Sequence, residues 1–545
     1  MKASDLLVQC LENEEVEYIF GIPGEENLDV MDSLIGSKIE FITTRHEQGA
    51  AFMADVYGRL TGKAGVCLAT LGPGATNLVT GFADANMDRA PIIAIAGQGA
   101  TTRMHKESHQ VLDLVNLFAP ISKYSVQIRE PEIVPEIIRK AFKAAEAEKP
   151  GGSFIDVPEN VAAMELSEDK APLKVQSAKA PVPPPAKIRQ AVEIINQARY
   201  PIVMAGNGVI RGDASDQLVK FAQMLNLPVA TTFMAKGTIP FSHDLSLGTV
   251  GLQAKDYVAC GFDRADVIIC VGFDMVEYHP HLWHQQKDKK IIHIDMNPAE
   301  VDEHYIVACG VIGDIKAALS EISVQADPRN EQQSSTLRDT IVNEFAEFSQ
   351  DESFPMKPQR IIWDLRQVLD DKDIVVSDVG AHKMWMARMY QAEAPNTCII
   401  SNGFASMGIG VPGAIAAKMV HPEQTCLTVT GDAGFMMNSQ EIETALRFNI
   451  AIIILIWTDS EYGLIKWHQL RRFKRDTQIS FTNPDFVKYA ESFGAKGYKV
   501  EAAADLIPTI KQAIKDDTVV IIDCPVDYSE NMKLTEKLGN LVCPI

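Results

Sequence analysis

Two stretches of this chain follow one pattern although 359 residues separate them. The segments VCLATLGPGATNLVTGFADANMDRAPIIAIAG (66–97) and TCLTVTGDAGFMMNSQEIETALRFNIAIIILI (425–456) align without a gap, so that Gly72 lies over Gly431. Each reads as an apolar strand, a glycine turn, a helix and a second apolar strand. The match predicts a duplicated α/β domain with a ligand held between the copies at strand carboxyl ends, although two unrelated doubly wound domains could imitate part of it.

The whole chain alternates short Val/Ile/Leu runs with longer helical patterns, which is typical of parallel sheets flanked by helices. A chain of 545 residues is too long for one hydrophobic core. Two polar stretches that contain proline, 167–187 and 324–360, read as linkers, the second around one expected helix. We therefore expect three doubly wound parallel-sheet α/β domains, at residues 1–166, 188–323 and 357–545.

The composition narrows the choice of partners and compartment. A net charge of −21 disfavours nucleic acid or an anionic membrane as a partner. The longest apolar run, AIIILIW (451–457), is too short to cross a bilayer, and the acidic N-terminus is unlike a signal peptide. Nine scattered cysteines without a CxxC pair indicate neither a disulfide framework nor a zinc site. We expect a cytoplasmic protein.

Two aspartates follow neighbouring strands of the expected third domain. Asp432 lies in the GDAG turn after TCLTVT, and Asp459 lies in TDSEYG after AIIILIW. A bare carboxylate would repel a phosphate bound at such a turn, so a hard divalent cation between them is the natural resolution. The alternative is that Asp432 caps the helix and Asp459 opens a turn.

These residues resemble the metal–diphosphate motif of thiamin-diphosphate enzymes, which is GDG followed by about thirty residues and NN. The chain departs from it at Ala433 and at Thr458-Asp459, and aspartate still offers an oxygen ligand. The resemblance implies thiamin diphosphate and Mg²⁺ as cofactors. It also implies metal binding by Asp432, Asp459 and the backbone carbonyl of Glu461, and cofactor contacts by Ala433, Gly434 and Tyr462.

The expected first domain resembles the pyrimidine-binding domain of the acetolactate synthase family in TTRHEQGAAFMADVYGRLTGKAG (43–65). The resemblance makes the first and third domains a duplicated thiamin-diphosphate-binding fold. It places Glu47 where a carboxyl group hydrogen-bonds the aminopyrimidine ring and stabilises its imino tautomer. The alternative is that Glu47 is only a favourable carboxylate at a helix N-terminus.

Three further segments carry the same resemblance. SNGFASMGIG (401–410) implies that the Ala405 carbonyl and the Met407 side chain hold the cofactor ring; core filling is the alternative for Met407. DVGAHKMW (378–385) places Ala381 and His382 near the phosphates, or else His382 is an unliganded surface residue. SHQVLDL (108–114) places Gln110 and His109 near the substrate, or else both are polar residues on a helix.

The sequence of the middle domain helps to distinguish the biosynthetic branch of the family from the catabolic branch. Biosynthetic acetohydroxyacid synthases carry an RFDDRVTG-like segment in their flavin-holding domain, whereas this chain has VGFDMVEYHPHLW (271–283), similar to the catabolic, flavin-independent type. Glu159 stands where the biosynthetic enzymes have lysine, and His468 or, with a shift of one residue, Trp467 stands at their selective tryptophan. FAD is therefore not expected, although GNGVIRG (206–212) could hold it through backbone contacts.

The resemblance implies a decarboxylating condensation of two pyruvate to 2-acetolactate and CO₂ through a thiamin-diphosphate enamine. It also implies a homodimer or homotetramer with active sites between chains. Alternatives are another thiamin-diphosphate 2-oxoacid decarboxylase or carboligase, a flavin oxidase, or the catalytic subunit of a biosynthetic acetohydroxyacid synthase. A non-catalytic regulatory paralogue and a nicotinamide-dependent dehydrogenase are more distant alternatives, the latter resting on GNGVIRG alone.

Overall fold

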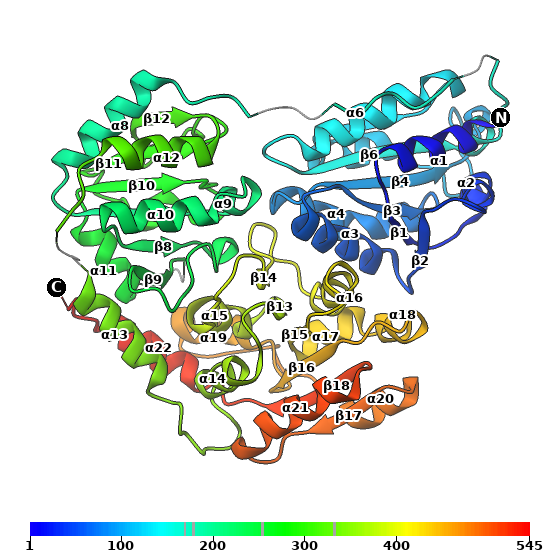
Figure 1. Ribbon diagram of the computed structural model, residues 1–545. Helices are drawn as coiled ribbons and strands as arrows, with labels where there is room; N and C mark the ends of the chain where they lie inside the picture. Colours follow the sequence, from blue (N-terminus) through cyan, green and yellow to red (C-terminus); the bar gives the residue numbers. More distant parts are fainter. Residues whose placement is uncertain (168–169, 177–179, 252–254, 331–333, 545) are drawn as a thin grey trace.

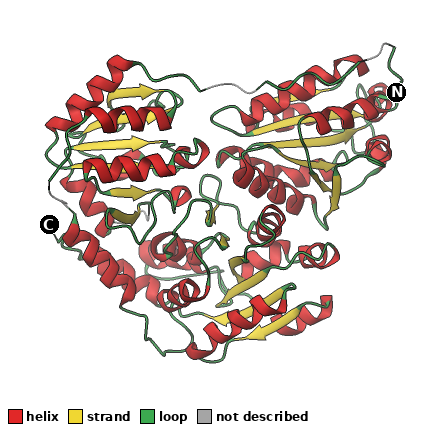
Figure 2. Cartoon of the chain, viewed as in Figure 1, coloured by secondary structure: helices red, strands yellow, loops and turns green. Residues whose placement is uncertain are grey.

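The computed structural model describes residues 1–545 except 168–169, 177–179, 252–254, 331–333 and 545. The described residues form three six-stranded sheets whose neighbouring strands are all parallel. Helices cover the sheets, and the three units lie in three lobes (Figures 1 and 2). The predicted α/β class with three doubly wound parallel sheets is confirmed.

The first sheet has the strand order β2-β1-β3-β4-β6-β5. Its strands are β1 (Tyr18–Gly21), β2 (Glu40–Thr43), β3 (Gly65–Ala69), β4 (Ile92–Gln98), β5 (Tyr124–Gln127) and β6 (Gly152–Pro158). Its helices are α1 (Ala3–Asn13), α2 (Leu28–Ser33), α3 (Glu47–Thr61), α4 (Pro73–Met87), α5 (Leu114–Phe118), α6 (Val134–Glu146) and α7 (Glu159–Ala162). The central strands β3, β4 and β6 are buried throughout, as their unbroken apolar runs predict for a sheet covered on both faces.

The third sheet repeats this order as β14-β13-β15-β16-β18-β17. Its strands are β13 (Ile374–Ser377), β14 (Cys398–Ile400), β15 (Cys426–Gly431), β16 (Ile453–Thr458), β17 (Lys496–Lys499) and β18 (Val520–Pro525). Its helices are α14 (Pro358–Val368), α15 (Ala381–Met389), α16 (Gly410–Val420), α17 (Asp432–Asn438), α18 (Glu441–Arg447), α19 (Gly463–Phe473), α20 (Phe486–Phe493), α21 (Leu506–Asp516) and α22 (Glu530–Gly539). The shared order confirms the duplication.

The two copies differ at the helix that follows the glycine turn. The single helix α4 of the first copy corresponds to two short helices, α17 and α18, in the third, because the helix breaks at Ser439-Gln440. Before the break, the Nδ2 of Asn438 donates a hydrogen bond of 2.9 Å to the carbonyl of Gly408. Helix α17 of the third domain is therefore tied to the segment 401–410, which the sequence resemblance assigns to the cofactor ring.

The middle sheet has a different order, β12-β11-β10-β7-β8-β9. Its strands are β7 (Pro201–Ala205), β8 (Val229–Thr231), β9 (Ser246–Thr249), β10 (Val267–Val271), β11 (Lys290–Asp295) and β12 (Val307–Ile312). Its helices are α8 (Pro185–Gln197), α9 (Gly208–Arg211), α10 (Ser215–Leu225), α11 (Tyr257–Arg264), α12 (Ile315–Gln325) and α13 (Ser335–Ala346). The strand order reverses between β7 and β10, because β8 and β9 are added on one side of β7 and β10 to β12 on the other. A doubly wound sheet binds its ligand at such a point.

The second expected linker is more ordered than its polar composition indicates. It contains α13, the one helix expected there, and Leu337, Ile341 and Phe345 on this helix are buried. The stretch therefore packs against the neighbouring domains. The proposed boundaries at 1–166, 188–323 and 357–545 stay a prediction.

The cysteine prediction was wrong in one respect. Cys260 of α11 and Cys543 form a disulfide across 283 residues of sequence. The chain end returns past α22 to the middle domain (Figure 1), and no spacing of cysteines in the sequence signals so distant a pair. Among the described residues, no helix combines the length and apolar character needed to cross a bilayer.

Candidate active site

The first residues of three helices meet at the carboxyl edge of the third sheet. These helices are α15, α17 and α19, which follow the adjacent strands β13, β15 and β16. A Cβ placed on Gly463 would lie 3.1 Å from the Oδ2 of Asp459 and 3.5 Å from the Cβ of Ala381. A Cβ on Gly431 would lie 3.3 Å from the ring of His382. Helix N-termini present free N–H groups and positive partial charge, so this edge suits an anion such as a diphosphate.

Asp432 links two turns of this edge. Its Oδ2 accepts hydrogen bonds from the backbone N–H of Asp459 at 3.2 Å and of Ser460 at 2.7 Å, and from the Nδ2 of Asn483 at 2.8 Å. Its Oδ1 accepts from the N–H of Ala433 at 2.9 Å. Gly431 is the N-cap of α17, so the alternative that Asp432 is merely the helix cap does not account for these bonds.

Asp459 lies close enough to Asp432 for their charges to interact. Burial, together with the Asp432 carboxylate, raises the pKa of Asp459 to about 7. Among the described residues, no cluster of three or more His, Cys, Asp or Glu forms a complete metal site. The protein thus supplies two carboxylates, and a hard cation here would share its remaining oxygen ligands with the backbone and a bound anion.

The other residues predicted to lie at this edge have clear partners. The carbonyl of Glu461 accepts a hydrogen bond from the N–H of Gly463 at 2.9 Å, while its carboxylate pairs with Lys466 at 2.6 Å. Tyr462 is 41% exposed beside Phe481. A Cβ on Gly434 would lie 3.1 Å from the Oδ2 of the buried Asp378, so only a glycine fits there without displacement.

His382 is buried, so the alternative that it is a surface histidine is wrong. Burial lowers the pKa of His382 to about 3, which keeps the imidazole neutral. Among the described residues, its Nε2 and the hydroxyl of Tyr528 are buried with no hydrogen-bond partner. Buried polar atoms normally have partners, so these two orphaned groups beside the aspartates fit a site for a polar ligand.

The loop 401–407 is held by α4 of the first domain. The Oγ of Ser401 donates to the Oδ1 of Asp84 at 2.7 Å, and the N–H of Asn402 donates to the Oδ2 of Asp88 at 2.9 Å. Arg59 forms salt bridges with both aspartates, at 3.2 and 2.6 Å. The sequence analysis missed this buried cluster, although the spacing of Asp84 and Asp88 on one helix face could have indicated it.

Two residues of this loop, Ala405 and Met407, were predicted to hold the cofactor ring. Ala405 has a φ of +58°, a conformation that costs free energy for a residue with a side chain and that gathers at functional sites. Met407 is half-buried and is not a member of the buried hydrophobic clusters, so core filling does not explain it.

Glu47 begins α3 and is 9% exposed. Its Oε2 accepts a hydrogen bond of 3.0 Å from the Nδ2 of Asn77 on α4, and His46 is the N-cap of the helix. Among the described residues, no hydrogen bond joins Glu47 to Asp432 or Asp459. The two residues before α3 contact α18 instead: the backbone N–H groups of Arg45 and His46 donate hydrogen bonds to the carboxylate of Glu441.

His109 and Gln110 are exposed and lie in a turn before α5, so the alternative of polar residues on a helix is wrong. Gln110 has a φ of +59° and packs against the glycine turn of the first copy, where a Cβ on Gly72 would lie 2.9 Å from its own Cβ. Glu159 supports the preceding loop by accepting hydrogen bonds from the N–H of Ala100 and the Nη1 of Arg103.

A cavity of about 760 Å³ opens between the third and middle domains. It reaches from Ala405 and Val379 in the third domain to Met275 and Leu282 in the middle domain. Trp467 and His468 both line it, so neither is singled out as the counterpart of a selective tryptophan.

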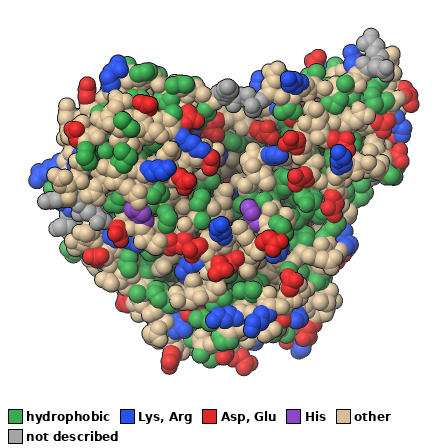
Figure 3. Space-filling view, viewed as in Figure 1, with side chains coloured by type: hydrophobic (Ala, Val, Ile, Leu, Met, Phe, Trp, Pro, Cys, Tyr) green, Lys and Arg blue, Asp and Glu red, His purple; other side chains and the backbone are tan. Residues whose placement is uncertain are grey.

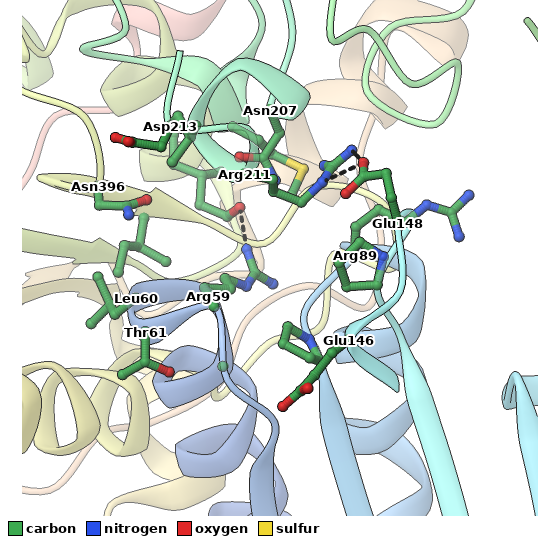
Figure 4. A pocket seen from close by; sticks show the side chains of 18 of the residues that line it. Arg59, Leu60, Thr61, Arg89, Glu146, Glu148, Asn207, Arg211, Asp213 and Asn396 are labelled. Atoms are coloured by element: carbon green, nitrogen blue, oxygen red, sulfur yellow. Dashed lines mark hydrogen bonds and ion pairs between the residues drawn. The ribbon is translucent and has the colours of Figure 1, made fainter. Parts of the chain in front are cut away.

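A second cavity of about 410 Å³ lies where the three domains meet. Figure 4 shows the guanidinium of Arg211 turned toward Glu148, and Arg59 bound to a backbone oxygen. Arg211 also pairs with Asp274 at 3.0 Å. These arginines are neutralised by carboxylates, so they hold the domains together.

The thiamine pyrophosphate enzyme family matches the chain in three places. The N-terminal TPP binding domain covers residues 1–117, the central domain covers 188–322, and the C-terminal TPP binding domain covers 378–524. The acetolactate synthase of Bacillus subtilis (strain 168) is 36% identical over 560 residues, which cover 99% of this chain and 97% of that protein.

The chain belongs to the acetolactate synthase family of thiamine pyrophosphate enzymes. A second relative is a probable acetolactate synthase large subunit of Methanococcus aeolicus, which is 35% identical over 99% of this chain and 95% of that protein. Another relative is the catabolic acetolactate synthase of Raoultella terrigena, which is 33% identical over 98% of this chain and 97% of that protein. Membership makes the chain a thiamine-pyrophosphate-dependent enzyme and confirms the resemblance seen in the sequence.

Proposed function

We propose that this enzyme is a catabolic-type acetolactate synthase, which condenses two molecules of pyruvate to 2-acetolactate and CO₂. The observation that carries the proposal is the polar edge around Asp432, Asp459 and His382, found in a chain that aligns over its whole length with acetolactate synthases. When bound, thiamin diphosphate supplies the electron sink for the loss of CO₂.

The residues of the third domain hold the cofactor. Asp432, Asp459 and the carbonyl of Glu461 bind Mg²⁺, which offsets the charge of the diphosphate. The buried His382, whose Nε2 has no partner among the described residues, would lie against the diphosphate. The remaining contacts are made by Ala381, Ala433, Gly434 and Tyr462 around the diphosphate and by Ala405 and Met407 at the ring.

The residues of the first domain act on protons and substrate. Glu47 would hydrogen-bond the aminopyrimidine ring of the bound cofactor, and the hydrogen bond that it accepts from Asn77 holds its carboxyl group in place. Gln110 and His109 stand on an exposed turn at the carboxyl edge of the first sheet, where they orient pyruvate.

Flavin is not part of this proposal, because the switch point of the middle sheet is filled by the chain itself. Both oxygens of Glu277 accept from the N–H of Asn207, each at 3.1 Å, and Oε1 also accepts from the N–H of Asp274 at 3.1 Å. The hydroxyl of Thr232 donates to the same carboxyl group. The N–H groups of Asn207 and Asp274, which lie at this point of the sheet, are thus occupied by a carboxyl group of the chain itself instead of a dinucleotide diphosphate.

We further propose a homodimer or homotetramer with active sites between chains. Phe404, Met436 and Met437, near the cofactor loop and on α17, are each more than 40% exposed. Large apolar side chains gathered near a site favour burial against a second copy. Acidic and basic side chains are interspersed on the face in Figure 3. With the net charge of −21, we include in the proposal a cytoplasmic protein without a nucleic acid or membrane partner.

The proposal is tested by the cofactors that activity requires. The purified protein is expected to be colourless and to form acetolactate from pyruvate with only thiamin diphosphate and Mg²⁺ added. A preparation that carries stoichiometric FAD, and that loses turnover when the flavin is removed, would move the chain to the biosynthetic or oxidase branch.

A further inference from the structure

Among the described residues that line the cavity between the third and middle domains, one cation is buried. Lys383, the third residue of α15, is 6% exposed and lines this cavity together with Ala405 and Val379. Within the described residues, its Nζ forms no hydrogen bond and no salt bridge. Its Nζ lies over the aromatic ring of Phe233, 5.9 Å from the ring centre, which is a weak cation–π contact. A buried ammonium group that forms no salt bridge is costly, so Lys383 indicates a place for an anionic ligand in this cavity.

The other charged groups of the cavity are already occupied or lie in solvent. Lys255 is exposed and pairs with Asp263, and Arg471 is exposed on α19. The carboxyl group of Glu277 is held by backbone N–H groups. Lys383 is therefore the buried cation that can meet an anionic molecule in this cavity.

Lys383 is charged in neutral solution. Burial lowers the pKa of Lys383 to about 8, while the carboxylates of Asp88 and Asp84 act in the opposite direction. The ammonium form still predominates at pH 7. Arg59 binds those two aspartates directly, so they hold the loop at 401–407 and leave the Lys383 ammonium available.

We propose that Lys383 binds the carboxylate of the acceptor 2-oxo acid, an assignment that rests on the proposed function. The donor pyruvate loses its carboxylate as neutral CO₂, so a cation beside that group would stabilise the ground state and oppose the reaction. The acceptor keeps its carboxylate: its carbonyl carbon forms the new carbon–carbon bond with the two-carbon unit left by the donor. Its carbonyl oxygen takes up the proton that the hydroxyl group of this unit gives up as the unit becomes the ketone of the product and its bond to the cofactor breaks. A fixed cation lowers the free energy of this anion throughout.

The experiment compares a charged and an uncharged acceptor in the holoenzyme. Lys383→Gln and Lys383→Met are supplied with pyruvate, and CO₂, acetolactate and acetaldehyde are measured. Acetaldehyde is then added as an acceptor that has no carboxylate, and acetoin is measured. Lys383→Arg is the conservative variant, and Arg471→Gln removes an exposed cation from the same cavity as the matched control.

We expect the ratio of acetolactate to CO₂ to fall about 10- to 100-fold in Lys383→Gln and Lys383→Met, the usual effect of losing a charged hydrogen bond. The two-carbon unit then takes up a proton and leaves as acetaldehyde. Acetoin formation from added acetaldehyde is retained, Lys383→Arg restores acetolactate, and Arg471→Gln matches the wild type.

Two results would overturn the assignment. One is an unchanged ratio of acetolactate to CO₂ in both neutral variants, and the other is an equal loss of acetolactate and acetoin, which a structural role would cause. Thermal unfolding of each variant shows that it is folded. Failure of the wild type itself to make acetolactate would instead refute the proposed function.

Discussion

The two aspartates at the edge of the third sheet are the residues on which cofactor binding depends. Asp432 accepts four hydrogen bonds, and its charge adds to the effect of burial in raising the pKa of Asp459. A cation between such groups removes their repulsion and allows both to ionise. The carboxylates of Asp432 and Asp459 therefore repel each other in the metal-free site, and a bound cation removes this repulsion.

Replacement of Asp432 by alanine is expected to weaken magnesium-dependent binding of thiamin diphosphate by more than about tenfold, because even indirect disturbance of metal ligands costs this much. Calorimetry with and without a chelator measures the effect. Glu423→Ala, at an exposed acidic residue of the same domain, is the control and should leave binding unchanged. Equal affinity of the wild type with and without the chelator would show that Asp432 serves only the turn.

Single residues also show which parts of the site could be predicted from the sequence alone. Asp432 and Asp459 could be found because each directly follows an apolar strand, and strand ends of adjacent parallel strands meet. Lys383 could not be found, since one lysine in an amphipathic pattern looks like any surface lysine. The disulfide of Cys260 with Cys543 depends on the path of the chain end, which no local pattern records.

At the scale of elements, the duplication of one domain was the most predictable feature. The repeat at 66–97 and 425–456 predicted equal topology, and the two sheets share it. The break between α17 and α18 was not predictable, because no glycine or proline marks it in the sequence. At this break Asn438 donates a tertiary hydrogen bond to Gly408. The reversal between β7 and β10 likewise follows from long-range pairing, and its occupant, Glu277, lies 70 residues from Asn207 in sequence.

The filled switch point of the middle domain predicts a pH dependence of stability. Burial and the nearby Asp274 raise the pKa of Glu277 to about 7, above its ordinary value of about 4.3. Between these values the folded protein keeps a proton that the unfolded chain has released. The free energy of unfolding therefore falls as pH rises through this window, by up to about 1.4 kcal/mol per pH unit.

Thermal unfolding between about pH 4.5 and about pH 7 tests this prediction. Glu277→Gln does not titrate, so its Tm is expected to fall less over this range than that of the wild type. Glu303→Gln, at an exposed glutamate of the same domain, should follow the wild-type curve. Parallel curves for all three proteins would show that Glu277 carries no such proton.

The whole molecule contains both halves of the cofactor site, and the assembly decides how they meet. If sites form between chains, Glu47 of one copy works with Asp432 of the other. Mixed dimers of Glu47→Gln and Asp432→Ala then contain one site without either substitution. Each variant alone is expected to lose about 10²–10⁴-fold in turnover.

Mixing the two variants after reversible dissociation should restore about a quarter of wild-type activity, since half the dimers are mixed and half of their sites are intact. The measurement is turnover before and after mixing, with sedimentation to confirm that dimers re-form. Two samples of Glu47→Gln mixed with each other are the control. No restoration in re-formed mixed dimers would place the site within one chain.

The account as a whole depends on carboligation, and the products of pyruvate test it most directly. Carbon-13 NMR of the wild-type reaction with labelled pyruvate, thiamin diphosphate and Mg²⁺ identifies and counts them. We expect 2-acetolactate and CO₂ in equal amounts, with two pyruvate consumed for each. Acetaldehyde and CO₂ without acetolactate, or no consumption of pyruvate by the cofactor-loaded protein, would contradict the account.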